Sequence, residues 1–373
     1  MKLIIISSAP FIYKNEKLFA YSPYLKELEI WQKYTDKIAF CCPEWKDENE
    51  LLITEFSFKI EKYFRLIDSD LNSFSNSFKA FFYSIYNFLV ILKAMFWADH
   101  IHLRCPGNIG LIGSLAQICF PKKIKTAKYA GNWDPNSNQP KSYKLQQWIL
   151  NNTFLTKNMK VLVYGKWENT SKNIKSFYTA TYSESEKIQY VSKKWNQKFK
   201  FIFVGTLVKG KNPFYAVQLI EYLLKDGFDV QLDLFGSGIL KRDLEKYIFE
   251  NKLHKNIFVK GNQNHNILKI AYQESHFVIL PSESEGWPKA IAEGMFWGCV
   301  PISTKVSCVP YMLDYENRGI FLSLNLEKDT FKIIEFLKNE NIFHQKSSSA
   351  FKWSNQFTTN KFEVEIKKLL RCE

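Results

Sequence analysis

The chain has few cysteines, and they form no pattern that marks a metal site or a disulfide framework. Seven cysteines are scattered over 373 residues, and the adjacent Cys41 and Cys42 cannot easily bond to each other. No Asp-x-Asp pair lies in a loop suited to a metal-bound diphosphate, and no His/Cys/Asp cluster has metal-ligand spacing. We therefore expect reduced thiols, a cytoplasmic protein, and neither a metal ion nor another cofactor.

The sequence also lacks a hydrophobic run of membrane-spanning length. The four apolar residues Leu3–Ile6 predict a first buried strand and are too few for a signal peptide. The most membrane-like segment, Ala80–Leu92, lies between Lys79 and Lys93 and falls short of the roughly 20 residues that a helical span needs. We expect a core helix there. The alternative is a helix whose lysines and aromatic side chains also touch lipid headgroups.

Acidic residues are outnumbered, because 51 Lys and Arg face 37 Asp and Glu and give a net charge of +14. No RNA- or DNA-binding motif accompanies this excess, and the lysines are spread along the whole chain, so we expect no nucleic-acid partner. Two interpretations stay open: a solvated lysine-rich surface, or a protein that handles anionic substrates beside an anionic membrane. The 46% hydrophobic content, without low-complexity tail or repeat, is typical of a globular protein.

Short apolar runs alternate with longer amphipathic stretches, which indicates a parallel α/β architecture. In the first half the predicted strands are Leu3–Ile6, Ile38–Phe40, His100–Leu103, Lys125–Tyr129 and Val161–Tyr164. The predicted helices between them are Tyr24–Tyr34, Phe74–Trp97, Asn108–Ile118 and Tyr143–Asn151. Around Ser183–Gln197 the pattern changes to a polar, lysine-rich connector.

A second, more regular series follows the connector. Its predicted strands are Phe201–Val204, Val230–Phe235, Asn256–Lys260 and Phe277–Leu280, and its predicted helices are Phe214–Lys225, Leu240–Asn251, Ile267–Glu274 and Phe357–Leu370. We expect two Rossmann-like, doubly wound parallel-sheet domains, residues 1–190 and 191–350, that face a central cleft. Residues 351–373 are expected to form a helix that packs back on the first domain, and ligands are expected at the carboxyl ends of the strands.

The segment after Phe277–Leu280 places two carboxylates, Glu285 and Glu293, on either side of a Gly-Trp-Pro turn that enters a helix. The amides at a helix N-terminus attract phosphate, Gly286 lets backbone approach a ligand closely, and Pro288 suits the first helical turn. Ionised carboxylates accept hydrogen bonds from vicinal hydroxyls, so the segment suits a nucleoside diphosphate sugar. The structural alternative is a helix N-terminal charge at Glu285 and a solvated residue at Glu293.

Five segments in a fixed order carry a family resemblance. They are Phe203–Pro213, Leu234–Gly238, Val259–Gly261, Pro281–Gly294 and Gly298–Thr304. Over about residues 200–320 they resemble the donor domain of GT4-type retaining glycosyltransferases of the GT-B fold. The first half of the chain resembles the acceptor domain of that family only loosely.

The resemblance implies a role for several residues. Glu285 would contact the transferred sugar, Glu293 the ribose, and the backbone from Gly286 through Trp287 to Pro288 the sugar and the phosphates. Lys211 would neutralise the departing diphosphate, with Lys209 as the alternative cation, although both lysines could also be solvated loop charges. The remaining donor-side residues expected from these motifs are Gly205, Thr206, Gly236 and Gly261.

Two departures from the family pattern concern charge and acceptor binding. Thr206 stands where the family usually has an arginine, so the diphosphate has one fixed cation less. The expected acceptor-side loop, Lys128–Asp134, lacks the usual histidine and offers Asn132, Trp133 and Asp134 instead, or is only a tight turn. Arg104, at the end of a predicted strand, could contact a phosphate or an anionic acceptor, or serve as a structural hydrogen-bond donor.

The sequence therefore predicts a retaining, metal-independent transferase of the hexosyltransferase type that uses a nucleotide-sugar co-substrate, with UDP favoured over GDP. The expected acceptor is a glycan or a lipid-linked glycan in cell-surface polysaccharide biosynthesis, and peripheral contact with an anionic membrane at its inner face is part of this hypothesis. The alternatives are a catalytically silent GT-B binding or scaffold protein, and a GT-B phosphorylase or epimerase.

Overall fold

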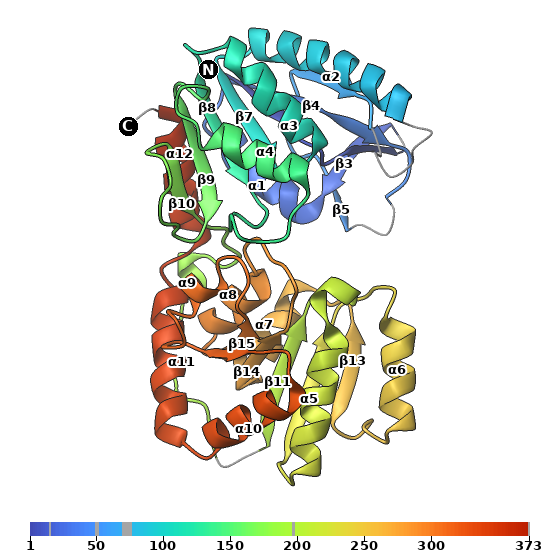
Figure 1. The fold of residues 1–373 in the computed structure, drawn as a ribbon, viewed down its shortest axis with the longest axis vertical. Coiled ribbons are helices and arrows are strands. Elements are labelled where there is room, and N and C mark those ends of the chain that lie inside the picture. The colour runs from blue at the N-terminus through green and yellow to red at the C-terminus, as the bar shows by residue number, and fades with distance from the viewer. Residues whose placement is uncertain (15, 49–51, 69–76, 196–197, 372–373) are drawn as a thin grey trace. The chain divides into compact units, whose positions relative to one another are not determined.

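The computed structural model describes residues 1–14, 16–48, 52–68, 77–195 and 198–371. Contacts divide the chain into two compact units (Figure 1), of which unit 1 comprises Met1–Phe177 and Glu363–Glu373 and unit 2 comprises Tyr178–Phe362. Each unit is built around its own, mainly parallel sheet, so the expected α/β class with two sheet units is confirmed. The division falls earlier than the boundary expected at residue 190, and it assigns the last residues of the chain to unit 1.

The sheet of unit 1 has the strand order β10-β9-β8-β7-β1-β4-β2-β3-β5, and β6 also pairs with β4. Its strands are β1 (Lys2–Ile6), β2 (Phe11–Lys14), β3 (Lys17–Tyr21), β4 (Lys37–Trp45), β5 (Ile53–Glu55), β6 (Lys62–Leu66), β7 (His100–Cys105), β8 (Ile124–Tyr129), β9 (Met159–Tyr164) and β10 (Ile174–Phe177). All pairs are parallel except those of β3 with β2 and β5. The five strands predicted for this half correspond to β1, β4, β7, β8 and β9.

Alternation along the strands separates two faces of this sheet. Ile101, Leu103 and Ala127 belong to the apolar core, together with side chains of α2 (Ser77–Trp97), α3 (Asn108–Ala116) and α4 (Lys141–Leu150). His102, between two of these residues, lies against Trp31 of α1 (Ser22–Gln32) on the other face. The predicted helix Phe74–Trp97 corresponds to α2 from residue 77 onward, and its residues 74–76 lie outside the described residues.

The sheet of unit 2 is wholly parallel and has the order β13-β12-β11-β14-β15-β16. Its strands are β11 (Phe199–Val204), β12 (Val230–Phe235), β13 (Ile257–Gly261), β14 (Phe277–Leu280), β15 (Val300–Thr304) and β16 (Ile320–Leu322). This is the doubly wound order of Rossmann folds, and the direction of winding reverses between β11 and β14. The four strands predicted for this half correspond to β11 to β14.

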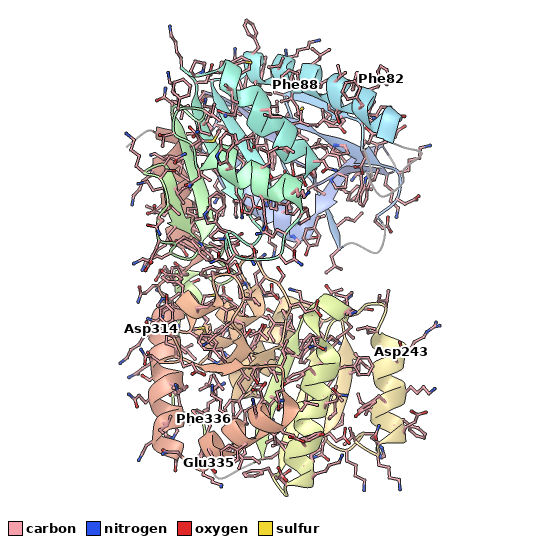
Figure 2. The ribbon with its side chains drawn as sticks, viewed as in Figure 1. Phe82, Phe88, Asp243, Asp314, Glu335 and Phe336 are labelled. Atoms are coloured by element: carbon pink, nitrogen blue, oxygen red, sulfur yellow. The ribbon has the colours of Figure 1, made fainter. Side chains whose placement is uncertain are left out.

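The helices of unit 2 cover both faces of its sheet. They are α5 (Pro213–Lys225), α6 (Lys241–Glu250), α7 (His265–Glu274), α8 (Lys289–Phe296), α9 (Val309–Met312), α10 (Leu326–Leu337) and α11 (Glu340–Ser354), and α12 (Thr359–Arg371) follows. Figure 2 labels two neighbours on α10: Phe336 packs inward on Phe277 of β14, whereas Glu335 is exposed. Such amphipathicity is what places α10 on the sheet.

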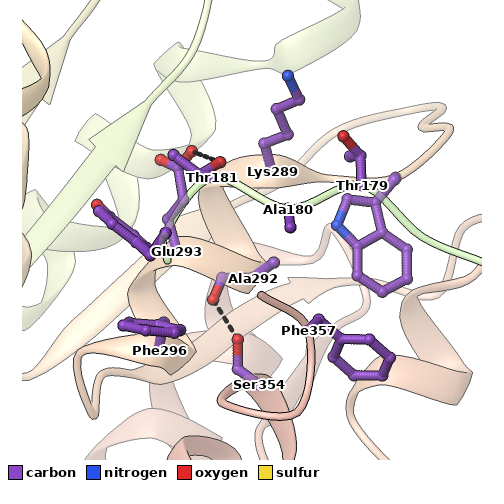
Figure 3. Close-up of a pocket in the computed structure, with 11 residues that line it drawn as sticks. Thr179, Ala180, Thr181, Lys289, Ala292, Glu293, Phe296, Ser354 and Phe357 are labelled. Atoms are coloured by element: carbon purple, nitrogen blue, oxygen red, sulfur yellow. Dashed lines mark hydrogen bonds between the residues drawn. The ribbon is translucent and has the colours of Figure 1, made fainter. Parts of the chain in front are cut away.

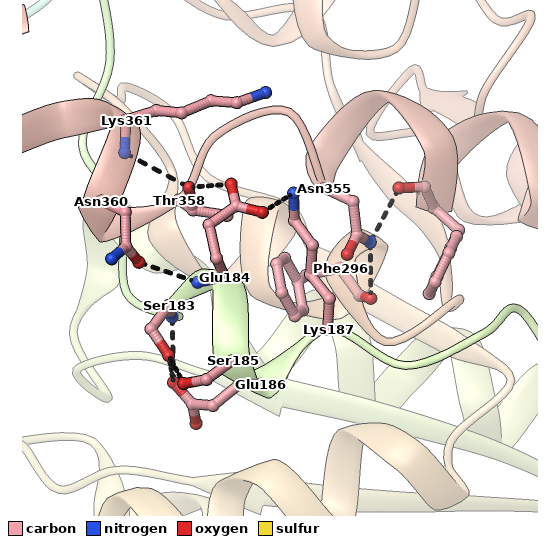
Figure 4. Close-up of polar contacts among 11 residues, drawn as sticks. Ser183, Glu184, Ser185, Glu186, Lys187, Phe296, Asn355, Thr358, Asn360 and Lys361 are labelled. Carbon is pink, nitrogen blue, oxygen red and sulfur yellow. Dashed lines mark hydrogen bonds and ion pairs between the residues drawn. The ribbon is translucent and has the colours of Figure 1, made fainter. Parts of the chain in front are cut away.

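The connector at the start of unit 2 has little regular secondary structure, but hydrogen bonds join it to the residues at the start of α12 (Figure 4). Ser183 begins a single 3-10 turn, Glu184–Glu186, and its backbone N–H donates to the Glu186 carboxylate. The Glu184 N–H donates to Asn360 Oδ1 at 2.8 Å, and the Thr358 hydroxyl donates to Glu184 Oε1 at 2.6 Å. These bonds fix the adjoining residues 179–182, which reach α8.

Candidate functional site

The loops after β11 and β14 lie next to each other, because these two strands pair at the point where the winding of the sheet reverses. The Glu283 N–H donates to the Gly210 carbonyl at 2.9 Å and joins the two loops directly. Ligands of doubly wound folds bind at this place, outside the carboxyl ends of the strands. Fold geometry alone therefore selects the two loops that hold most of the donor-side residues expected from the sequence.

Lys211 and Glu285 form an ion pair across these loops, with 2.5 Å between Lys211 Nζ and Glu285 Oε1. The Glu285 side chain is only 6% exposed, whereas that of Lys211 is 30% exposed. Lys211 ends a 3-10 turn, and Asn212, with a φ of 52°, then redirects the chain into α5. The structure thus brings together the two residues expected to carry the chemistry, and it leaves Lys209 exposed.

Glycines allow the loop after β12 to close on the loop after β11. Gly236 has a φ of +139°, and a Cβ there would lie 1.9 Å from the Gly205 carbonyl oxygen. The Gly236 N–H donates to the Gly261 carbonyl at 2.9 Å, so three of the expected glycines meet at the ends of β11, β12 and β13. Thr206, which follows Gly205, is exposed.

The loop between β14 and α8 is held from the side of β15. The Gly286 carbonyl accepts hydrogen bonds from Ser307 Oγ at 3.2 Å and from Cys308 Sγ at 3.1 Å. The Trp287 ring is buried and stacks on Trp353, with 6.1 Å between centroids. Pro288 is the N-cap of α8, and no side chain of the described residues caps that end of the helix by a hydrogen bond. The first amides of α8 therefore stay available for an anionic group.

Glu293 lies on α8 and lines a small pocket with the stretch 179–182 (Figure 3). Its carboxylate Oε1 accepts a hydrogen bond from Thr181 Oγ1 at 2.7 Å. Burial raises the pKa of Glu293, while the Thr181 hydroxyl and the Lys289 ammonium act in the opposite direction. The other lining residues are Thr179, Ala180, Tyr182, Trp287, Lys289, Ala292, Phe296, Ser354 and Phe357. Glu285 and Glu293 thus have different partners, an ammonium group and a hydroxyl group.

Arg104, in unit 1, belongs to a buried ion-pair network. Glu27 of α1 accepts from Arg104 at 2.9 Å and from Lys128 of β8 at 2.7 Å. The Arg104 guanidinium also lies 4.5 Å from the Tyr24 ring centroid. Although burial opposes ionisation of Glu27, the two cations hold its pKa well below the usual range. The structure therefore gives Arg104 an internal carboxylate partner.

The loop after β8 forms a tight turn through the residues expected on the acceptor side. Asn132 Oδ1 accepts from the Asp134 N–H at 2.9 Å, and Asp134 Oδ1 accepts from the Asn136 N–H at 2.9 Å. Trp133 is buried and packs edge-on against Tyr129, with 4.9 Å between centroids. Asn132 and Asp134 thus stabilise the turn, and Trp133 is anchored in the core of unit 1.

The sequence analysis did not identify the side chains that pair with Glu293 and Arg104. Thr181 lies in an irregular segment 112 positions from Glu293, and Glu27 lies 77 positions from Arg104. No local pattern signals either pairing. For Glu27, the sequence offers an acid in a predicted helix but not its burial. Over the described ranges, no group of three His, Cys, Asp or Glu side chains could hold a metal ion.

The chain resembles known proteins over its second half. Residues 184–353 match the family model described as Glycosyl transferases group 1. Over 166 residues the chain is 27% identical to the poly(glycerol-phosphate) alpha-glucosyltransferase of Bacillus subtilis (strain 168), a match that covers 44% of this chain and 24% of the relative. Over 132 residues it is 31% identical to the UDP-Gal:alpha-D-GlcNAc-diphosphoundecaprenol alpha-1,3-galactosyltransferase of Escherichia coli, covering 34% and 33%. The chain spans less than half the length of both relatives.

Solved structures resemble the whole chain. Anabaena Alr3699/HepE in complex with UDP matches with a TM-score of 0.69 at 12% identity and covers 100% of this chain and 99% of its own. The lipopolysaccharide outer core galactosyltransferase WaaB matches with a TM-score of 0.67 at 15% identity and the same coverage. At such identities the likeness concerns the fold. The match of residues 184–353 to the glycosyl transferases group 1 model and the GT-B fold of the chain thus agree with the resemblance that its five segments indicated.

Proposed function

We propose that this protein is a retaining glycosyltransferase that moves a hexose from a nucleotide diphosphate donor to a glycan or lipid-linked glycan. The observation that carries the proposal is the Lys211–Glu285 pair at the winding reversal of unit 2. At that place a cation can bind the diphosphate and a carboxylate can bind the sugar, which are the two groups joined by the bond that must break. The match of residues 184–353 to the family supports it.

In the proposed reaction the bond between the anomeric carbon and the diphosphate breaks as the acceptor hydroxyl attacks the same face of the sugar. The hydroxyl proton passes to the departing phosphate oxygen, and no enzyme nucleophile takes part. The diphosphate gains charge as it leaves, so the Lys211 ammonium and the first amides of α8 stabilise the transition state more than the ground state. We assign this role to these groups without a metal ion.

The two glutamates would hold the rings on either side of the diphosphate. Donor phosphate oxygens compete with Glu285 for the Lys211 ammonium, and Glu285 is then free to accept hydrogen bonds from sugar hydroxyls. Glu293 would accept hydrogen bonds from the ribose diol. Its Oε1 already accepts from the Thr181 hydroxyl, so the ribose hydroxyls would share the carboxylate with this partner. Gly205, Gly236 and Gly261 would supply a backbone surface that the donor can approach.

The relatives indicate which donor and acceptor classes to test first. We favour UDP, because a structural neighbour is described in complex with UDP and the E. coli relative is named for a UDP-galactose donor. The relatives are also named for poly(glycerol phosphate), for a diphosphoundecaprenol-linked sugar and for capsular polysaccharide biosynthesis. For this chain we accordingly propose an acceptor of cell-surface polysaccharide biosynthesis.

The test is donor turnover together with a thermal-shift screen of nucleotide sugars, since a ligand that binds the native state raises the unfolding midpoint. We expect one UDP-sugar to stabilise the protein and to be turned over. Lys211→Ala should lower turnover about 10²–10³-fold, because it removes one preorganised donor of positive charge. Glu285→Ala should lower turnover as well, while nucleotide binding persists.

A matched control is Lys338→Ala, which breaks another Lys–Glu pair of unit 2, the 2.8 Å pair of Lys338 with Glu335, and should leave turnover unchanged. Nucleotide binding without turnover of any donor, in wild type and both variants alike, would instead favour the catalytically silent alternative. That alternative draws its support from Thr206 and from the neutralisation of Lys211 by Glu285.

A further inference from the structure

Three tryptophans line one pocket of unit 1. Trp133 comes from the loop after β8, Trp148 from α4 and Trp167 from the loop after β9. The pocket has a volume of about 450 Å³ and is partly open to solvent. This volume lies within the roughly 300–1,000 Å³ typical of small-molecule sites. None of the donor-side residues discussed above lines it.

Two of the rings are held in place without any ligand. Trp133, at the floor, packs edge-on against Tyr129, and Trp167 donates from Nε1 to the Tyr164 carbonyl at 2.7 Å. Trp148, in contrast, is 60% exposed. A fixed indole loses little conformational entropy when a ligand packs on it, and an exposed indole gains most from being covered. The aromatic surface is therefore organised in advance of binding.

Polar side chains complete the lining. Lys144, Glu168 and Asn169 line the same pocket, and within the described part of the chain their side chains form no ion pair and no hydrogen bond. They offer an ammonium donor, a carboxylate acceptor and an amide with both functions. One positive and one negative group leave this set without net charge, which disfavours a polyanion such as a nucleic acid.

We propose that this pocket binds the pyranose rings of a neutral carbohydrate. One face of a pyranose carries C–H groups and packs on an indole, whereas its equatorial hydroxyls point outward to carboxylate, amide and ammonium groups. Aromatic walls with a few polar groups at the edge match both properties. The site would add a glycan-binding subsite in unit 1, and it rests on the proposed function only for the choice of a glycan as ligand.

The probes are maltotriose and chitotriose, with the acyclic polyol sorbitol as the control ligand that lacks a rigid apolar face. The readout is the set of indole N–H resonances of protein labelled with ¹⁵N-tryptophan. Either trisaccharide should shift the resonances of Trp148 and Trp167 and leave that of Trp97, at the end of α2, unchanged. Trp148→Ala should abolish binding, and Glu168→Gln should weaken it several-fold.

Phe154→Ala is the matched control variant, because it removes another exposed aromatic ring of unit 1 that does not line the pocket. It should bind both probes as wild type does, and unfolding midpoints should show that both alanine variants are folded. The proposal is overturned if neither trisaccharide shifts the two resonances, if sorbitol shifts them equally, or if Phe154→Ala also abolishes binding. Titration with UDP concerns unit 2 and separates this failure from a failure of the proposed function.

Discussion

At the scale of single residues, the donor side contains a carboxylate, that of Glu293, whose surroundings disfavour its ionised form. Glu293 is partly enclosed by Thr181, Phe296 and other lining side chains, and burial raises its pKa above the ordinary value of 4.5. A carboxylate with this environment destabilises the folded state when it is ionised, because the unfolded chain solvates it better. Its retention on α8 is understandable if the ionised form serves a ligand.

We therefore predict that Glu293→Gln is more stable than wild type at pH 7. The native pKa is raised, so the folded state binds more protons than the unfolded state between the ordinary and the native pKa, and wild-type stability falls as pH rises through that window. Below the ordinary value both states are protonated, and the advantage of the Glu293→Gln variant over wild type disappears. Urea unfolding at pH 7 and at pH 4 measures both free energies of unfolding.

The glutamine keeps an oxygen that can accept from Thr181, so the substitution changes charge more than hydrogen bonding. The control is Glu335→Gln on α10, where the carboxylate is exposed and stability should stay within about 0.5 kcal/mol of wild type. A Glu293→Gln protein that is less stable than wild type at pH 7 contradicts the prediction. Nucleotide affinity should fall in the Glu293 variant alone.

At the scale of elements, the strands and their loops position the site. The loops after β11 and β12 approach so closely that only a glycine fits at position 236, where the Gly205 carbonyl occupies the place of a Cβ. Gly238 repeats the arrangement, since a Cβ there would lie 2.5 Å from the Leu207 carbonyl oxygen. The backbone contacts between strand ends are therefore encoded by glycines rather than by side-chain interactions.

We predict that Gly236→Ala destabilises the protein by at least about 1–3 kcal/mol, because the new methyl group overlaps backbone that cannot move alone. Gly210→Ala is the matched control in the neighbouring loop. No atom lies within 4 Å of its Cβ position, so its free energy of unfolding should stay within about 0.5 kcal/mol of wild type. Urea unfolding measures the free energy of unfolding of both variants. Equal values for the two would contradict the requirement for glycine at position 236.

The sequence predicted those elements whose pattern is local. All nine predicted strands exist. Most are runs of mainly apolar residues buried on both faces, whereas β8 includes two buried lysines and β13 is largely part-exposed. The strands β2, β3 and β5 were missed because they are short and partly exposed. β15 carries Pro301, which argues against a strand, and β16 has only three residues.

The candidate site was predictable to a similar extent. Lys211 and Glu285 follow from motifs, since each lies at a recognisable place between a strand and a helix. Their direct pairing does not follow, because it depends on β11 and β14 being neighbours in the sheet. The same holds for the tryptophans of unit 1, where Trp133 and Trp167 meet beside α4 only through the tertiary structure.

At the scale of the whole molecule, the apolar surface is unevenly distributed. No helix among the described residues is both long and apolar enough to cross a membrane. One stripe of α2 is nevertheless exposed along most of its length, and Figure 2 labels Phe82 on it. The stripe consists of the exposed residues Phe81, Phe82, Ile85, Tyr86, Leu89 and Phe96. Lys93 is exposed on the same helix, and the Lys123 ammonium lies 5.7 Å from the Phe96 ring centroid.

We predict that this stripe supports the peripheral membrane contact expected from the net charge of +14. Wild-type protein should float with vesicles that contain phosphatidylglycerol at low salt, less so at high salt, and not with neutral vesicles. Replacing Phe82, Ile85 and Leu89 together by serine should remove most of the binding. Fully burying one such side chain contributes about 1.5–3 kcal/mol, and the replaced groups are exposed, so folding should be unaffected.

The matched control replaces three exposed apolar residues of unit 2, Ile239, Phe249 and Ile270, by serine. If exposed apolar surface of any kind were sufficient, both triple variants would lose flotation to the same degree. If charge alone were sufficient, neither would lose it, since both keep every lysine. Loss confined to the α2 variant is the result that assigns membrane contact to the helix, because its three residues lie together on one helical surface with Lys93, whereas the control residues lie on three separate segments.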